Sequence, residues 1–183
     1  MKSFHSIDGS ITAPQGFLAA GLFCDVKSIG TGKGSNKGQK RDLAVIVSEV
    51  PATAAGMFTT NQICAAPVKV CVNHIANGKA QAVVINSGNA NACTGPTGLK
   101  DAKEMTALMA EELLLQPEDV LVGSTGRIGL QLPMPNIRKG IGQIVKELDD
   151  SPTAAHHAAE AIMTSDTQPK EIAVEFKLGQ QTV

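Results

Sequence analysis

The hydrophobic pattern changes along the chain from short strand-like runs to longer helix-like segments. Strands are predicted over residues 43–49, 56–60, 67–72, 81–86, 120–122 and 172–178. The run at 81–86 is apolar on both faces, which is typical of a strand in the interior of a sheet. The run at 67–72 carries valines on one face only and therefore predicts a half-exposed strand. Residues 179–181 predict a hairpin turn, and because the sequence stops just inside the returning strand, we expect the natural chain to continue.

Apolar residues recur at helical spacing in three further segments. The first predicts an amphipathic helix over residues 101–116. The second begins at Pro135 and extends to about residue 148. The third is rich in alanine, with Ser151 as its N-cap, Pro152 in its first turn and an end near Met163. The order of these elements predicts a mixed α/β fold of α+β-like character, with much antiparallel pairing. The length fits a single domain over residues 1–183.

Composition narrows the class of protein. Hydrophobic residues make up 43 % and charged residues 18 %, which is typical of a globular chain. Sixteen basic and seventeen acidic residues give a net charge of −1, which argues against a nucleic-acid partner. No run approaches the roughly 20 apolar residues of a membrane span, and no secretion signal is evident. We therefore expect a cytoplasmic protein.

Few residues suggest a metal or phosphate site. The four cysteines lie far apart without a C-x-x-C pair, so we expect buried, reduced thiols and no zinc. His156 and His157 are adjacent on a predicted helix and point about 100° apart, so they cannot share a metal. The glycine-rich basic stretch at 28–41 runs into a strand and not into a helix. It therefore predicts a solvated hairpin loop, not a phosphate-binding loop.

Two segments at predicted strand ends are candidates for a site. Residues 86–95 combine three asparagines with two glycines directly after the predicted central strand. Residues 123–129 form a glycine-flanked turn at another predicted strand end, where a backbone N–H beside a hydroxyl would form a donor pair for an oxyanion. Each segment taken alone also fits a tightly packed structural turn, and the residues themselves leave both interpretations open.

These segments resemble the ornithine acetyltransferases, also called bifunctional glutamate N-acetyltransferases, of arginine biosynthesis. The resemblance covers essentially the whole chain. The matching segments, in the order and approximate spacing of that family, are 12–21, 50–60, 65–68, 86–95, 124–126 and 163–167.

The resemblance implies a layered αββα architecture and a precursor that cleaves itself between an Ala and a Thr. The present sequence resembles the α chain, without its last segment before the cleavage site. The new N-terminal Thr of the β chain would be the nucleophile, sheets would be shared between the chains, and the assembly would be α2β2 or larger. Thr125 and Gly126 would form the oxyanion hole, and Thr164 would contact the amino-acid substrate. Arg127 stands where many relatives have an apolar residue.

The implied reaction moves the acetyl group of N2-acetylornithine to glutamate through an acetyl-Thr intermediate. It needs no cofactor or metal, and acetyl-CoA would be a substrate only in bifunctional members. The α chain alone should be inactive. Two alternatives stay open: a subunit of an N-terminal-nucleophile-like amidase or aminopeptidase, and a non-enzymatic α-like binding protein.

Overall fold

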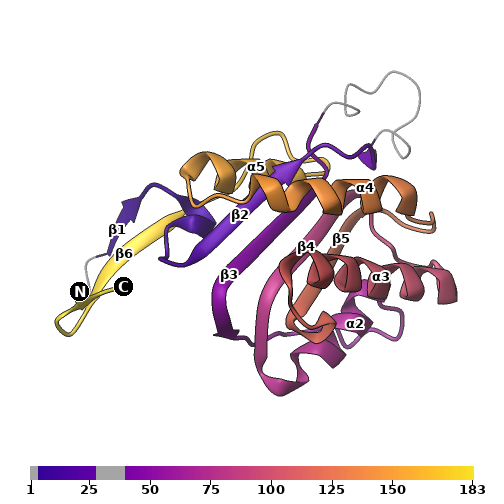
Figure 1. Ribbon diagram of the computed structural model, residues 1–183, viewed down its shortest axis with the longest axis horizontal. Helices are drawn as coiled ribbons and strands as arrows, with labels where there is room; N and C mark the ends of the chain where they lie inside the picture. Colours follow the sequence, from indigo (N-terminus) through magenta and orange to yellow (C-terminus); the bar gives the residue numbers. More distant parts are fainter. Residues whose placement is uncertain (1–3, 28–39) are drawn as a thin grey trace.

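A four-stranded sheet forms the centre of the computed structural model, which describes residues 4–27 and 40–183 (Figure 1). Its strands, in sheet order, are β2 (Phe17–Leu22), β3 (Leu43–Thr53), β4 (Lys79–Asn89) and β5 (Val120–Arg127). β2, β3 and β4 pair antiparallel, and β5 joins β4 in parallel. The predicted mixed α/β class and the interior position of residues 81–86 are confirmed. The loop predicted within 28–41 lies, up to residue 39, outside the described residues.

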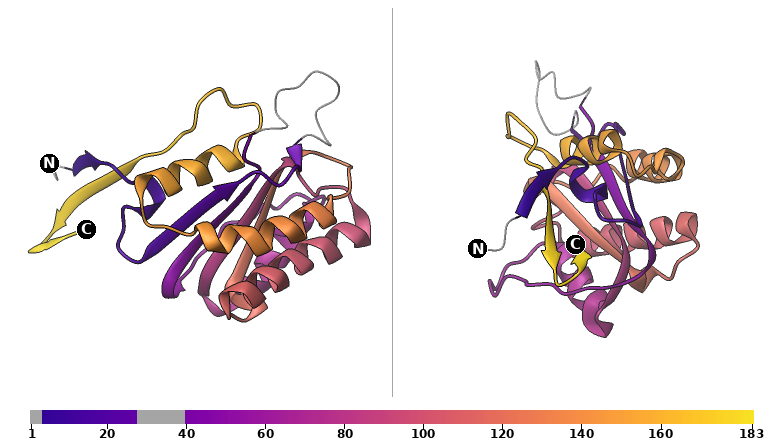
Figure 2. Two further views of the ribbon diagram at one scale, coloured as in Figure 1. Left: turned by 45° about the horizontal axis from the view of Figure 1, so that its top comes forward. Right: turned by 90° about the vertical axis from the view of Figure 1, so that its left-hand side faces the viewer.

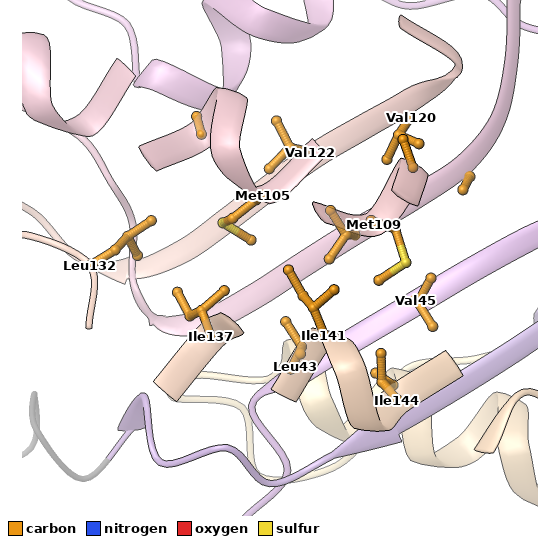
Figure 3. Packing of buried hydrophobic residues seen from close by; sticks show 14 of the residues in the cluster. Leu43, Val45, Met105, Met109, Val120, Val122, Leu132, Ile137, Ile141 and Ile144 are labelled. Atoms are coloured by element: carbon orange, nitrogen blue, oxygen red, sulfur yellow. The ribbon is translucent and has the colours of Figure 1, made fainter. Parts of the chain in front are cut away.

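Three helices pack against one face of this sheet or beside its edge. They are α2 (Ala66–His74), α3 (Gly95–Leu113) and α4 (Met134–Ile144). The core between sheet and helices is aliphatic, in keeping with an aromatic content of only 3 %. Figure 3 shows Leu43 and Val45 of β3 facing Met109 of α3 and Ile141 of α4, and all four are at most 1 % exposed. In the described part of the chain, four short 3-10 helices connect the elements: η1 (Ser10–Thr12), η3 (Ile75–Asn77), η4 (Pro117–Asp119) and η5 (Val145–Glu147).

The alanine-rich helix α5 (Pro152–Ile162) packs on the opposite face, mainly over β2 and β3 (Figures 1 and 2). Small side chains let it approach closely: a Cβ on Gly21 would lie 2.1 Å from the carbonyl oxygen of His157. Ser151 caps the helix by accepting a hydrogen bond from the N–H of Ala154 at 3.3 Å, as predicted. Beyond α5, the same face carries apolar side chains that are only half-buried: Ile46, Val83 and Leu121.

A second, three-stranded antiparallel sheet projects from the body of the molecule (Figure 2). It consists of β1 (Phe4–Ile7), β6 (Ala173–Leu178) and β7 (Gln181–Thr182). The predicted strand at 172–178 and the hairpin after it are confirmed, because β6 and β7 pair antiparallel around Gly179.

Two predicted strands are wrong. Residues 56–60 have no regular structure, and Met57 is 99 % exposed, so no packing stabilises a strand there. Residues 67–72 lie in α2, where Pro67 occupies the first turn and the buried positions Ala66, Pro67 and Val70 follow helical spacing. A short valine-rich run is compatible with either element, and here the contact with β5 decides.

Helix α3 is offset from its prediction over residues 101–116. It begins at Gly95, since Pro96 suits the first turn. It ends at Leu113, before Pro117, because Leu114 takes a left-handed conformation with φ 57°.

Candidate active site

Thr125 and Gly126 lie inside strand β5, which continues beyond the predicted strand at 120–122 to Arg127. The predicted turn at 123–129 is therefore strand for most of its length. The asparagine-rich segment at 86–95 likewise begins as strand, because β4 extends to Asn89. Strand pairing continues into both segments because the parallel register places Ser87 opposite Thr125 and Gly88 opposite Gly126.

The two opposed glycines bring the strands unusually close together. Gly88 has φ 105° and Gly126 has φ 129°, conformations that side chains other than glycine rarely adopt. A Cβ on Gly126 would lie 2.4 Å from the carbonyl carbon of Gly88. Glycine is thus required at residue 126 for both conformation and space, and it remains exposed to solvent.

The N–H of Gly126 points to the outer edge of the sheet. Val122 directs its N–H and C=O away from β4, where both contact the Cys71 sulfur, at 3.3 and 3.1 Å. Backbone groups alternate along a strand, so Gly126, four residues later, shares the orientation of Val122. The carbonyl of Arg127 points the other way and accepts the N–H of Ala90 at 2.8 Å. The Gly126 N–H and the half-buried Thr125 hydroxyl can therefore act as adjacent donors.

Helix α2 covers the earlier part of the same edge. Besides the Cys71 contacts, the Nδ1 atom of His74 lies 2.8 Å from the carbonyl oxygen of Val120, so this nitrogen carries the proton and donates. The unpaired backbone groups of β5 are thereby satisfied at Val120 and Val122 by side chains.

The asparagines of residues 86–95 form buried hydrogen bonds beside the candidate site. Asn86 accepts the Ser124 hydroxyl at 2.6 Å and donates to the carbonyl of Asn89 at 2.9 Å. Asn89 in turn donates to the carbonyl of Gln131 at 2.9 Å, and Asn91 donates to a carbonyl in the first turn of α3. All three asparagines are buried, and their side chains make these hydrogen bonds within the chain. The interpretation of this segment as a packed structural turn therefore fits the asparagines, which also fix the residue next to Thr125.

Thr164 lies at the same end of the sheet as Thr125. The hydroxyl of Ser87, which is fully buried, donates a hydrogen bond to the carbonyl of Ala161 in the last turn of α5. Thr164 follows three residues later, just beyond the helix end. The structure thus places the end of α5, three residues before Thr164, against the strand that pairs with Thr125 and Gly126.

A cavity of about 250 Å³ opens beside Thr164. Its lining residues are Lys27, Lys40, Arg41, Glu160, Met163, Thr164, Asp166, Thr167 and Pro169. Arg41 is held on three sides: it donates to the Gly21 carbonyl at 3.0 Å, pairs with Glu160 at 2.7 Å, and lies 2.9 Å from Nε2 of His157. Burial, and then the charge of Arg41, lower the pKa of His157. A neutral His157 can thus accept from the guanidinium.

Sequence reasoning missed the Arg41 cluster. His157 and Glu160 are three residues apart on one helix, but 116 and 119 positions separate them from Arg41, so the sequence carried no signal of the contact. The neighbouring His156 instead pairs with Glu171 at 2.6 Å, and this hydrogen bond raises the pKa of His156. The two adjacent histidines therefore have different hydrogen-bond partners, Arg41 for His157 and Glu171 for His156.

The cysteines are free thiols, but the prediction that all are buried is wrong. Cys93 is exposed, and Cys24, Cys64 and Cys71 are only partly buried. Burial raises the pKa of the Cys24 thiol above its usual range. Within residues 4–27 and 40–183, no three His, Cys, Asp or Glu side chains are grouped to hold a metal ion. No helix in the same ranges is both long and apolar enough to cross a membrane.

The fold and the sheet-end site define a mixed α/β protein with a candidate oxyanion-binding centre. The chain belongs to the ArgJ family, whose model matches residues 27–183. This confirms the resemblance to the ornithine acetyltransferases.

Among curated relatives, the chain is 48 % identical over 175 residues to the arginine biosynthesis bifunctional protein ArgJ of Symbiobacterium thermophilum. It is 46 % identical over 184 residues to the protein of that name from Shouchella clausii. The alignments cover 96 % and 100 % of this chain but only 41 % of each relative. The chain therefore spans about two fifths of the length of these relatives.

Two solved structures share the fold. The bifunctional protein ArgJ of Bacillus halodurans matches with a TM-score of 0.90 at 39 % identity, over 100 % of this chain and 91 % of that chain. The ornithine acetyltransferase of Mycobacterium tuberculosis, in complex with ornithine, matches with a TM-score of 0.84 at 36 % identity. That alignment covers 95 % of this chain and 88 % of the solved one.

Proposed function

We propose that this chain is the α subunit of an acetyltransferase of arginine biosynthesis, which moves the acetyl group of N2-acetylornithine to glutamate. The observation that supports this most directly is the glycine pair Gly88 and Gly126, which leaves the Gly126 N–H at an exposed edge beside the Thr125 hydroxyl. Membership of the ArgJ family adds independent support.

The proposed enzyme consists of two chains cut from one precursor. The α chain would be active only together with the β chain, which carries the nucleophilic N-terminal Thr. In support, the chain covers 41 % of curated relatives but 91 % and 88 % of the matching solved chains, so family members occur in crystals as chains of about this length. The half-buried apolar face beyond α5 offers a contact surface for the β chain in an αβ unit, assembled as α2β2 or larger. We expect the assembly in the cytoplasm.

The mechanism follows from the poor reactivity of an amide acetyl group. The β-chain Thr hydroxyl would attack the acetyl carbonyl while the N-terminal amine takes its proton. The carbonyl oxygen then gains negative charge, which Thr125 and Gly126 stabilise more strongly than they stabilise the neutral carbonyl. The carbon–nitrogen bond breaks, and ornithine leaves with the proton on its amine.

The second half of the cycle returns the enzyme to its starting state. The glutamate amine attacks the acetyl-Thr ester, the same donors stabilise the oxygen again, and N-acetylglutamate leaves as the Thr hydroxyl is restored. Thr164 would hold the amino-acid substrate in both halves. The cycle uses no cofactor, and acetyl-CoA would serve as an alternative acetyl donor in a bifunctional enzyme.

The test uses the full-length gene product. Purified protein should contain a second chain beginning with Thr in equal amount, and N-acetylornithine should acetylate that Thr, which intact-mass spectrometry detects. Ornithine release should require glutamate in steady state. Acetate release without glutamate would identify an amidase instead, and a single uncleaved chain without turnover would support a non-enzymatic binding protein.

A further inference from the structure

Two of the four cysteines line a second cavity, which the proposed acetyl transfer does not use. This cavity has a volume of about 480 Å³ and lies where the packed helices α2 and α3 begin. Cys64 directly precedes Ala65, the N-cap of α2, and Cys93 directly precedes Thr94, the N-cap of α3. Both cysteines belong to the lining, and the volume is typical of a pocket for a small molecule.

The two cysteine-bearing segments are joined through their backbones. The N–H of Ala66 donates to the carbonyl of Asn91 at 3.1 Å. Each cysteine lies two residues, or at most about 7 Å of chain, from this hydrogen bond. Residues 54–65 form neither helix nor strand, so Cys64 can move without breaking either. A disulfide requires a Cα separation of about 4–7 Å, which segments joined so close to both cysteines can reach.

Neither packing nor backbone conformation explains a cysteine at residue 93. Free cysteine is among the residue types most often buried, but Cys93 is exposed. Its φ of 56° lies in the left-handed region, which glycine or asparagine adopts at lower cost. The property that distinguishes cysteine at this position is therefore the chemistry of its thiol.

The other two cysteines are protected by their surroundings. Burial raises the pKa of the Cys71 thiol, which also hydrogen-bonds to the carbonyl of Val122 at 3.1 Å. Burial, and then the charge of Asp42, raise the pKa of the Cys24 thiol. A thiol reacts as its thiolate and only where a reagent can reach it, so both should be inert near neutral pH. Cys93 and its neighbour in the cavity, Cys64, are thus the candidates for thiol chemistry.

We propose that Cys64 and Cys93 form a reversible disulfide when the protein meets a small-molecule disulfide. The Cys93 thiolate attacks one sulfur of the reagent, which gives a mixed disulfide and releases one reagent thiol. The Cys64 thiolate then attacks the Cys93 sulfur, and the second reagent thiol leaves. The two protein thiols lose two electrons and two protons, and the reagent disulfide gains both as it becomes two thiols. This inference goes beyond the proposed function and does not depend on it.

The bond would tie the start of α2 to the start of α3. Because Cys93 is exposed, the bond would stay accessible to reduction. In a reducing compartment, disulfides of this kind are usually transient and sense the redox state. Among the described residues that line the cavity, Lys69 alone is charged, so the site favours an anionic disulfide.

The experiment treats the full-length wild-type protein with oxidised glutathione, an anionic disulfide, in native buffer at neutral pH. Intact-mass spectrometry should show the loss of two hydrogen atoms. Peptide mapping should link the peptides that contain Cys64 and Cys93, and dithiothreitol should restore the starting mass. The proposal is overturned by absence of reaction at both residues, by glutathione that remains on either one without a link, or by a link to another cysteine.

Three variants test the order of the two steps. Cys64→Ser removes the second thiol, so glutathione should remain attached to Cys93. Cys93→Ser should prevent the link and react more slowly, because Cys64 is only partly exposed. Cys71→Ser is the matched control: it lies outside the cavity, keeps a side chain that can hydrogen-bond to Val122, and should form the link as fast as the wild type. Loss of the link in Cys71→Ser would contradict the assignment, and where a variant does not fold, the wild-type peptide map decides alone.

Discussion

Ser87 and Ala161 join the two halves of the candidate site through one buried hydrogen bond. The Ser87 hydroxyl on β4 donates to the Ala161 carbonyl at the end of α5, and both residues are 0 % exposed. Ser87 lies opposite Thr125 in the sheet, and Thr164 follows Ala161 by three positions. The bond therefore couples the strand pair that carries the proposed oxyanion donors to the segment that leads into the Thr164 cavity.

Replacing Ser87 with Ala should lower both stability and substrate affinity. The Ala161 carbonyl would stay buried without its donor, which costs about 1–3 kcal/mol in urea unfolding. KM for N-acetylornithine should rise because the Thr164 segment loses its anchor. Ser48→Ala is the control, since the Ser48 hydroxyl bonds only locally to the Val50 carbonyl. It should lower stability without changing KM, and equal KM values in both variants would refute the coupling.

Thr125→Ala should reduce kcat by about 10²–10³ with little change in KM, because the hydroxyl matters most when the carbonyl oxygen is charged. Thr125→Ser keeps the hydroxyl and should retain most activity. Each variant must first be checked by mass spectrometry for the cleaved β chain, since the same donors could serve cleavage. A cleaved Thr125→Ala enzyme with normal kcat would leave the Gly126 N–H as the oxyanion donor of this chain.

Thr164→Ala should raise KM for N-acetylornithine more than it lowers kcat, because a contact present in the bound substrate is lost. Steady-state kinetics on the folded, cleaved enzyme measure both parameters. An unchanged KM would remove Thr164 from the substrate site.

Gly126→Ala should destabilise the protein by about 3 kcal/mol or more, because a Cβ would overlap Gly88 and the positive φ is strained. Gly129 has φ 84°, but a Cβ added there would meet no atom within 4 Å, so Gly129→Ala should cost only about 1 kcal/mol. Urea unfolding of the two variants compares them directly. Equal losses would show that contact with Gly88 adds nothing.

The adjacent histidines should shift acid stability in opposite directions. The pKa of His157 is lowered in the folded state, so the unfolded chain binds more protons and stability falls as the pH drops through the unfolded pKa near 6.5. His157→Gln should therefore reduce the loss of stability between pH 7.5 and 5.5. The pKa of His156 is raised, so its contribution is present below pH 6.5 and lost as the pH rises through its folded pKa. His156→Gln should enlarge the acid loss, though weakly, since the side chain is 46 % exposed. Melting temperatures at both pH values test the signs.

Local pattern predicted the elements whose packing agrees with their sequence. The apolar run around Val83 and the capped helix after Ser151 needed no knowledge of their neighbours. Residues 67–72 could not be assigned without their neighbours. Their valines favour a strand, but Pro67 lies in the first turn of a helix that packs on β5. The pattern alone did not reveal the helix.

The candidate site was only partly accessible from sequence. Thr125, Gly126 and Thr164 were identified through resemblance, and the contact of Ser87 with Ala161 that links their segments was not derivable from spacing. Lys27 and Arg41 lie more than a hundred positions from Glu160, and only tertiary structure shows that they line one cavity with it.

The side-chain cover on β5 has a consequence for how the molecule resists aggregation. An uncovered strand edge can template the addition of another chain. The side chains of Cys71 and His74 hydrogen-bond to the backbone groups of Val122 and Val120. This part of β5 therefore offers no template for another strand. The open backbone is confined to the last residues of the strand, around Gly126. At the β5 edge, the backbone left open is thus limited to the few atoms that a ligand would occupy.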